Sequence, residues 1–407
     1  MIEYSRRHRI LLLAQRGPYH RFRRGNDVDQ LTIGGPAEVD AKLARIRGYL
    51  AESGLGAILL TRQDNFAWLT GGRDNHVAAG SDVGVASLLV TPTDRVVVTN
   101  QIEAGRLRDE EIGDQGWEWR TYDWFRPSGF VAAVRDVAGD RPIGSDTPFP
   151  GAGPLDGAFD RLRADLLSAE VERYRAVGRE MTAAIEETCQ HVHAGQTELE
   201  IAADLSRRVR AHGGQPGVIL IAADERINKY RHPIPTDRKL RDYVMLVLGG
   251  SMWGLTISIS RFVAFHPLAP ELRQKWRDVS TVAAYFTIAT RPGREWSEIF
   301  RGATELYGRL GWPDEWRLHH QGGPTGYRGR DFTAGFESSG VVAATQAAAW
   351  NPSIAGTKSE DTIIVTASGH EFLTRQTGWP TIKIEYDGAA FEFSDVLIRQ
   401  QVVRRYA

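Results

Sequence analysis

Three histidines in two short stretches of the sequence could carry acid–base chemistry. His232 lies in NKYRHPIP, and His319 and His320 open the stretch HHQGGPTG. A neutral imidazole near pH 7 accepts a proton from water and can return it to a leaving nitrogen, which suits hydrolysis. The two glycines that follow the histidine pair, Gly322 and Gly323, let the backbone approach a ligand closely.

Two charged residues could complete such a site. Arg330, in GYRGRD, carries a planar guanidinium that grips a carboxylate through two parallel hydrogen bonds. Glu360 and Asp361 open an apolar strand in GTKSEDTIIV. This pair is either an ordinary set of charges at a sheet edge or part of a buried site. A buried carboxylate needs a histidine, an arginine or a substrate cation as its partner.

Composition restricts the class of protein and ligand. The 407 residues are more than one hydrophobic core normally supports, so we expect two domains. Lys and Arg number 50 against 51 Asp and Glu, which argues against a nucleic-acid partner and favours a small-molecule or peptide ligand. The longest early apolar run, Ile10 to Ala14, is far too short to span a membrane. The single cysteine, Cys189, fits a reducing compartment, so we expect a cytoplasmic protein.

The first third of the chain predicts a small mixed domain. An arginine-rich arm, residues 1–36, is expected to be solvated or to embrace a second copy of the chain. Apolar residues at helical spacing then predict a helix that leads into a buried strand at 57–61. Residues 83–100 predict a β-hairpin, and the segment 141–157, rich in Pro and Gly, is the best candidate for a linker.

The remaining residues predict a larger domain in which helices and strands are mixed. The predicted elements are a long helix after Ser168, a helix opened by the capping box Thr197-Glu-Leu-Glu200, a strand at 217–224, helices at about 270–290 and 295–310, and strands over 359–402 with a hairpin turning at Asp387-Gly388. We therefore expect an α/β (α+β) fold with domains at 37–160 and 161–407.

This order of elements, with several local motifs, resembles the pita-bread superfamily of creatinases, prolidases and methionine and Xaa-Pro aminopeptidases. The resemblance covers about residues 39–402. It implies a small N-terminal creatinase-type domain followed by a C-terminal pita-bread domain. In that superfamily Asp, Asp, His, Glu and Glu bind two divalent metals, because two close cations need several anionic oxygens around a bridging water.

Placed on this chain, four of the five ligand positions carry residues that cannot replace the ligand. The family's two aspartates fall at Val247, in VMLVLGG, and at Ser258, in GLTISISR. Its histidine falls at Gly323 and its first glutamate at Asn351, in WNPS, whereas Glu360 keeps the last carboxylate. The resemblance thus implies a family member that has lost its metals and needs no cofactor.

Creatinases, which work without metal, imply roles for the residues that remain. A histidine at the position of His232 shuttles the proton there, and an arginine near the end of the glycine-rich turn, here Arg330, holds the substrate carboxylate. Glu360 would orient the histidine or bind a cationic group. Glu360 and Asn351 both depart from the creatinase pattern, so the substrate is not expected to be creatine.

Further candidate residues have alternative interpretations as ordinary structure. His319 and His320 either form a turn packed under the sheet or line the pocket, and Ser258 and Asn351 either hydrogen-bond the substrate or fill space. The other residues that we expect to contact substrate are Tyr327 and Trp350.

Arg73 and His76 lie in LTGGRDNHV, on the loop of the N-terminal domain that in creatinases reaches into the partner subunit's active site. The resemblance therefore implies a homodimer in which Arg73 joins the site. The alternative is a surface loop in which Arg73 forms an ion pair with Asp74.

These observations support three hypotheses for the function. The first is a metal-independent hydrolase of a C–N bond in a small carboxylate-bearing molecule, with His232 as base and then acid. A lyase in the same site stays open, since a histidine base can equally remove a proton and expel a leaving group. The third is a peptidase-like binding protein that has kept the fold and lost the chemistry.

Overall fold

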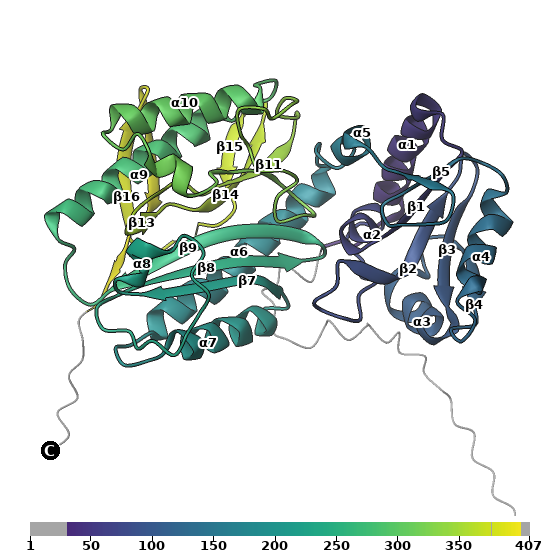
Figure 1. Cartoon of the computed structure of the whole chain (residues 1–407), viewed down its shortest axis with the longest axis horizontal. Helices are drawn as coiled ribbons and strands as arrows, with labels where there is room; N and C mark the ends of the chain where they lie inside the picture. The colour runs from purple at the N-terminus through teal and green to yellow at the C-terminus, as the bar shows by residue number, and fades with distance from the viewer. Residues whose placement is uncertain (1–30, 376, 400–407) are drawn as a thin grey trace, which may run out of the picture.

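The computed structural model describes residues 31–375 and 377–399. The predicted basic arm lies outside these ranges except for its last six residues, 31–36. The described chain forms two lobes, and the N-terminal end of the long helix α6 (Ser168–His191) points from the C-terminal lobe toward the N-terminal one (Figure 1). None of the helices in the described part of the chain is long and apolar enough to cross a membrane.

The N-terminal lobe is a six-stranded mixed sheet of order β4-β3-β2-β1-β5-β6 with helices packed against it. The predicted hairpin is confirmed, since β2 pairs with β3 in antiparallel fashion. The predicted linker at 141–157 is wrong, because it contributes the edge strands β5 and β6, which extend the sheet in parallel from β1. The elements are α1 (Pro36–Ser53), β1 (Ala57–Arg62), α2 (Gln63–Leu69), β2 (Val83–Val90), β3 (Arg95–Asn100), α3 (Gln101–Arg106), η3 (Leu107–Ile112), β4 (Glu118–Tyr122), α4 (Ser128–Ala138), β5 (Ile143–Ser145), β6 (Ala152–Pro154) and α5 (Gly157–Arg161).

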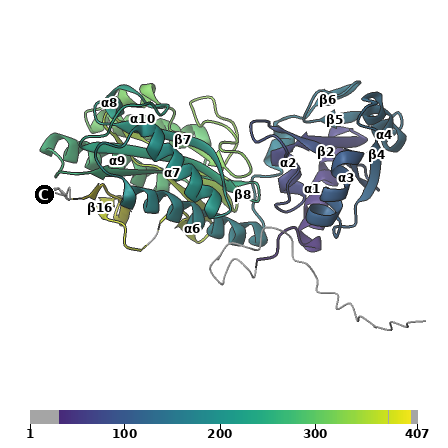
Figure 2. The ribbon, with the colours of Figure 1, turned by 90° about the horizontal axis from the view of Figure 1, so that it is seen from below.

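The C-terminal lobe contains two four-stranded sheets, of orders β18-β9-β8-β7 and β10-β11-β14-β15. Helices α6 and α7 cover one face of the β7-β8-β9 layer, and the second sheet with α9 and α10 lies over the other (Figures 1 and 2). The further elements are α7 (Glu198–Ala211), β7 (Gln215–Ala223), α8 (Arg226–Lys229), β8 (Tyr243–Met252), β9 (Leu255–Ala264), α9 (Pro270–Ala289), α10 (Trp296–Arg309), η4 (Glu315–Leu318), β10 (Gly322–Thr325), β11 (Gln346–Trp350), β12 (Ser353–Ile354), β13 (Thr357–Lys358), β14 (Asp361–Thr366), β15 (Gly369–Phe372), β16 (Thr381–Tyr386), β17 (Ala389–Ser394) and β18 (Leu397–Ile398).

Local sequence signals set several of these boundaries. The predicted capping box is confirmed, because the Thr197 hydroxyl accepts the Glu200 N–H and the Glu200 carboxylate accepts the Thr197 N–H. The turn between β16 and β17 has positive φ at both central residues, 49° at Asp387 and 74° at Gly388. That conformation suits an Asp-Gly hairpin and matches the twist of the two strands.

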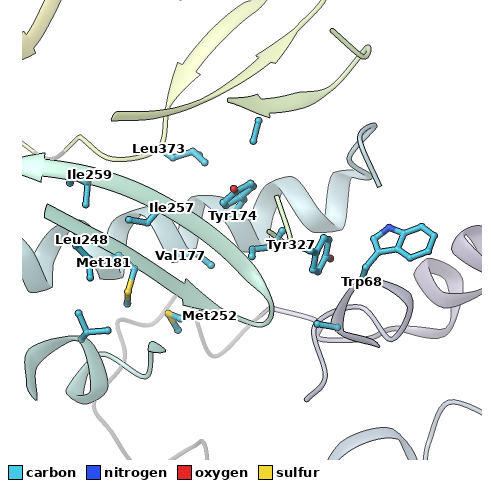
Figure 3. Packing of buried hydrophobic residues seen from close by; sticks show 14 of the residues in the cluster. Trp68, Tyr174, Val177, Met181, Leu248, Met252, Ile257, Ile259, Tyr327 and Leu373 are labelled. Atoms are coloured by element: carbon cyan, nitrogen blue, oxygen red, sulfur yellow. The ribbon is translucent and has the colours of Figure 1, made fainter. Parts of the chain in front are cut away.

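A continuous apolar core joins the two lobes. Trp68 of α2 in the N-terminal lobe and Tyr327 of the C-terminal lobe belong to the same buried cluster as Tyr174 of α6 and Ile257 of β9. Figure 3 shows Trp68 and Tyr327 on the two sides of the boundary between the lobes, with Tyr174 farther along α6. The lobes are therefore packed together rather than tethered by a loop.

A buried ionic network crosses the same boundary. The guanidinium of Arg173 in α6 donates two hydrogen bonds of 2.6 Å to the carboxylate of Glu38 in α1. The ammonium of Lys42 lies 2.6 Å from Glu38 and 2.8 Å from Glu170. Glu170 also accepts the hydroxyl of Tyr327 at 2.7 Å. Because both Arg173 and Lys42 are fully buried, each charge in this network depends on its partners.

Replacing Arg173 by leucine is expected to lower the free energy of unfolding by about 3–5 kcal/mol, because the variant leaves Glu38 buried with one cation instead of two. Arg175→Leu is the matched control on the same helix, since Arg175 forms an exposed pair with Glu371 at 2.8 Å. An exposed pair is worth ~0–1 kcal/mol. Chemical denaturation of the two variants measures the difference, and equal losses would contradict the role given to the buried network.

Candidate active site

The structure brings the three predicted histidines together. His232 lies in the loop after α8, whereas His319 and His320 lie between η4 and β10. The Nε2 atoms of His232 and His319 are 3.1 Å apart. Ring nitrogens of all three residues lie within 4.8 Å of one another, one from each ring. We call these three residues the histidine cluster.

Contacts around the cluster hold its two loops in place. Arg231, next to His232, forms an ion pair with Glu315 of η4, so the two loops are tied together. The side-chain amide of Gln321 donates to the His319 carbonyl at 2.6 Å. His319 itself is buried, His320 is half-buried and His232 is exposed, so the cluster opens to solvent through His232.

The environment favours the neutral form of all three imidazoles. Burial lowers the pKa of His232, and the nearby Lys358 ammonium lowers it further. Burial and the Arg330 guanidinium lower the pKa of His320 to about 4. Burial, followed by Lys358, lowers the pKa of His319 well below its usual range. Neutral imidazoles can accept protons or donate one N–H each.

A buried ionic group lies beside the cluster. The Glu360 carboxylate, which is 4% exposed, accepts the hydroxyl of Ser260 at 2.6 Å and lies 2.9 Å from the Lys358 ammonium. Arg330 lies 3.5 Å from the other carboxylate oxygen and donates to the Ser258 hydroxyl at 2.8 Å. We call these five residues the ionic cluster.

The balance of charge in the ionic cluster is positive. Burial alone would raise the pKa of Glu360, but Lys358 and Arg330 outweigh burial and keep it below its usual value. The carboxylate is therefore ionised at neutral pH, and two cations face one anion. A net positive group beside three neutral imidazoles attracts an anionic ligand.

The strands explain how these side chains meet. Ser258 and Ser260 are two residues apart on β9, so their side chains point to the same face of the sheet. The Ser260 N–H donates to the Glu360 carbonyl at 3.2 Å, and the Ser258 N–H donates to the Thr362 hydroxyl at 2.9 Å. The start of β14 thus lies against β9, which brings Glu360 next to both serines.

Sequence reasoning missed Lys358 and Ser260. Ser260 could have been found from the two-residue period of a strand, because it stands two positions after Ser258 on β9. Lys358 ends β13, and Glu360 lies between β13 and β14, so strand spacing does not relate these two residues. Of the partners expected for Glu360, the structure shows an arginine, Arg330, and not a histidine. The carboxylate also contacts Lys358 and Ser260, whereas His232 pairs with His319.

The residues at the positions expected for metal ligands do not fit a pair of divalent ions. Val247, Ser258, Gly323 and Asn351 offer no carboxylate. The one carboxylate at these positions, Glu360, already faces two protein cations. Two metal ions would need several anionic oxygens, and Lys358 and Arg330 would repel them.

Two residues expected at the site belong to the structural core instead. Trp350 stacks on Phe286 with ring centroids 4.1 Å apart, and its indole N–H donates to the Thr290 hydroxyl. Tyr327 is 4% exposed, and its hydroxyl belongs to the ionic network between the lobes. Trp350 was expected at the site because it stands beside Asn351, but its side chain packs in the core.

Asn351 is 2% exposed at the end of β11, and its backbone N–H donates to the Gln321 carbonyl at 3.0 Å. Among the contacts of the described residues, its side-chain oxygen has no hydrogen-bond partner. The role expected for Asn351 toward substrate remains a prediction.

Arg73 and His76 line a different hollow. They belong to a groove of about 770 Å³ between the lobes, walled on the other side by Trp253 and the turn of β8 and β9. Arg73 lies 3.8 Å from Asp114, and His76 rather than Arg73 pairs with Asp74. Of the described residues, those that line this groove include no member of the histidine cluster. The loop thus lies apart from the cluster of its own chain.

Two family models match the chain in the order of its lobes. The creatinase/prolidase N-terminal domain matches residues 42–149, and metallopeptidase family M24 matches residues 172–367. Together with the fold, these matches define a two-domain creatinase/prolidase-like chain. The two matches support a creatinase/prolidase-like protein of pita-bread type whose C-terminal lobe is similar to the M24 peptidases.

Individual relatives are distant. An uncharacterized peptidase of Staphylococcus haemolyticus is 24% identical over 232 residues, which are 54% of this chain and 66% of the relative. The chain thus spans just under two thirds of that relative.

Solved structures show the shared fold over a larger part of the chain. A Xaa-Pro dipeptidase from Bacillus anthracis has a TM-score of 0.69 at 18% identity, covering 83% of this chain and 98% of its own. A prolidase from Pyrococcus horikoshii has a TM-score of 0.70 at 16% identity, covering 82% and 98%. The N-terminal domain of the FACT complex subunit SPT16 from chickpea (Cicer arietinum) has a TM-score of 0.62 at 11% identity, covering 83% and 96%. Because the fold also occurs in a subunit of a complex, the function has to be argued from the site.

Proposed function

We propose that the protein hydrolyses a C–N bond in a small carboxylate-bearing molecule without the metal pair of its family. The observation that carries the proposal is the neutral histidine cluster, with His232 Nε2 3.1 Å from His319 Nε2, beside a buried group of two cations and one carboxylate. The histidine cluster can move protons, and the ionic cluster can bind an anion.

The pair of imidazoles defines which atom moves the proton. In the proposed tautomer His232 donates its Nε2–H to His319, so that Nδ1 of His232 carries the free lone pair. That nitrogen takes a proton from water as the water oxygen attacks the carbon of the C–N bond. The imidazolium then returns the proton to the nitrogen, which leaves with it as the bond breaks. His319 acts as a positioning residue.

The ionic cluster supplies the binding of substrate. Arg330 already uses one nitrogen on Ser258, but its Nε has no partner among the contacts of the described chain. A substrate carboxylate that meets Arg330 and Lys358 would offset their excess positive charge. Glu360 forms ion pairs with both cations, Arg330 and Lys358. Its single negative charge does not cancel their two positive charges, so the ionic cluster keeps a net positive charge.

The proposal includes a homodimer. The cavity between His319 and Lys358 in the single chain measures only about 10 Å³, and His232 is exposed. A small-molecule site usually encloses its ligand, so a second chain is needed to cover the cluster, with the loop of Arg73 as the covering segment. Light scattering of the active protein tests this part, and an active monomer would contradict it.

A panel of small carboxylates with one C–N bond tests the activity, including N-acyl and N-carbamoyl amino acids and dipeptides. Hydrolysis is expected to release an amine together with a product that contains one oxygen from water labelled with heavy oxygen. A product that is unsaturated and unlabelled would establish the lyase alternative. Binding without turnover across the panel would support the peptidase-like binding protein.

A further inference from the structure

The geometry points to a second property of the histidine cluster: we propose that His232, His319 and His320 bind one transition-metal ion such as Zn²⁺ or Co²⁺, and that this ion inhibits the enzyme. The site is distinct from the five family ligand positions, since none of the three histidines stands at Val247, Ser258, Gly323, Asn351 or Glu360.

The spacing of the ring nitrogens suits one ion. Two nitrogens bound to a tetrahedral zinc at ~2.0–2.1 Å are about 3.3–3.4 Å apart. The Nε2 atoms of His232 and His319 are 3.1 Å apart. One ring nitrogen from each of the three histidines lies within 4.8 Å of the other two. A small rotation of the exposed His232 ring would open the first distance to the required value.

The chemical state of the imidazoles also suits a metal. Neutral imidazole is a preferred ligand for zinc, copper, nickel and cobalt. The cluster holds no carboxylate, so it selects such ions over Mg²⁺ and Ca²⁺, which prefer oxygen. The Nδ1 atom of His320 is buried without a partner among the contacts of the described residues, so its lone pair is free for an ion. His232 leaves an entry path from solvent.

Lys358 opposes the ion and limits its affinity. Its ammonium acts on all three histidines and is held by Glu360 at 2.9 Å. A divalent ion in the cluster would face this positive charge at close range. Replacing Lys358 by methionine is therefore expected to tighten metal binding.

Inhibition rests on the proposed function. A metal bound to the Nε2 atoms of His232 and His319 replaces the hydrogen bond between them, so His232 loses the N–H by which His319 positions it. The bound ion also withdraws the cluster from proton transfer. Zinc would then lower kcat in proportion to the occupied fraction.

Cobalt binding tests the site without any substrate. The full chain is stripped with a chelator and titrated with Co²⁺ while its visible absorption is recorded. We expect one Co²⁺ per chain with the strong bands of a four-coordinate ion. His232→Ala and His320→Ala should each weaken binding by at least ~10–100-fold, because each removes a direct ligand and even the loss of a supporting hydrogen bond costs this much.

Two controls separate this site from others. His370, which stacks on Phe391 and lies outside the cluster, can be replaced by alanine without loss of binding. Glu360→Gln should weaken binding less than either histidine variant, because it removes a nearby negative charge and no ligand. An ion at the family ligand positions would instead lose a direct ligand. The proposal is overturned if the wild type binds no Co²⁺, or if binding survives the loss of His232 and His320. Failure of the proposed hydrolysis leaves this titration unaffected, so the two failures are distinguishable.

Discussion

His232→Gln is expected to lower kcat by ~10²–10⁴-fold, the usual contribution of general acid–base catalysis. Without a metal to acidify water, the reaction needs a side chain that both takes and returns a proton near neutral pH, and the imidazole of His232 has that range. Glutamine fills similar space and can still donate to His319, so the loop is expected to stay folded. The measurement is turnover on the substrate identified from the panel.

A matched control distinguishes this loss from a general effect of removing a histidine. His266 lies on the surface 3.5 Å from Asp242, so His266→Gln should keep wild-type turnover. Wild-type turnover of His232→Gln would place the proton shuttle elsewhere. His320 would then be the next residue to replace, because it belongs to the histidine cluster and the charges of Arg330 and Glu360 both act on the pKa of its imidazole.

Arg330→Lys is expected to raise KM by ~10–100-fold, because each hydrogen bond to a charged group contributes ~1.5–3 kcal/mol. Arginine can hold Ser258 with one nitrogen and still present another donor to a carboxylate. A lysine ammonium is a point charge on a flexible stem and cannot make both contacts in the same geometry. The effect should fall mainly on KM, since the arginine binds the substrate before and during the reaction.

Arg328→Lys provides the control, because Arg328 lies two residues away on the same loop but pairs with Asp64 and Asp160. Steady-state kinetics of both variants measure the difference. An Arg330→Lys enzyme with unchanged KM would show that Lys358 or another cation anchors the carboxylate.

Much of the fold could be predicted from local signals. The helix that ends at Gly54 has its glycine in the left-handed conformation, with φ of 72°, and the capping box and the Asp-Gly turn occur where the sequence indicated. These features depend on residues close together in the chain. The segment 141–157 was read as a linker because Pro and Gly interrupt it. Its two strands of three residues each are too short to show a pattern.

The sequence predicted which residues form the candidate site better than it predicted the contacts between them. Resemblance to the family placed His232, Arg330 and Glu360 in one region, and the structure brings them near one another. The partner of each side chain could not be read from the sequence, because Ser260, Lys358 and His319 reach the site from separate elements. Tyr327 was expected to contact substrate, but its buried hydroxyl donates to Glu170 at the boundary between the lobes.

The most direct test of metal-independent hydrolysis measures turnover and metal content in the same sample. The full chain is treated with a strong chelator, its bound metals are quantified, and its activity is compared with that of the untreated protein. We expect turnover to be undiminished when the protein holds less than one metal ion per chain. Turnover that disappears with the metal and returns when Mn²⁺, Co²⁺ or Zn²⁺ is restored would contradict metal-independent hydrolysis.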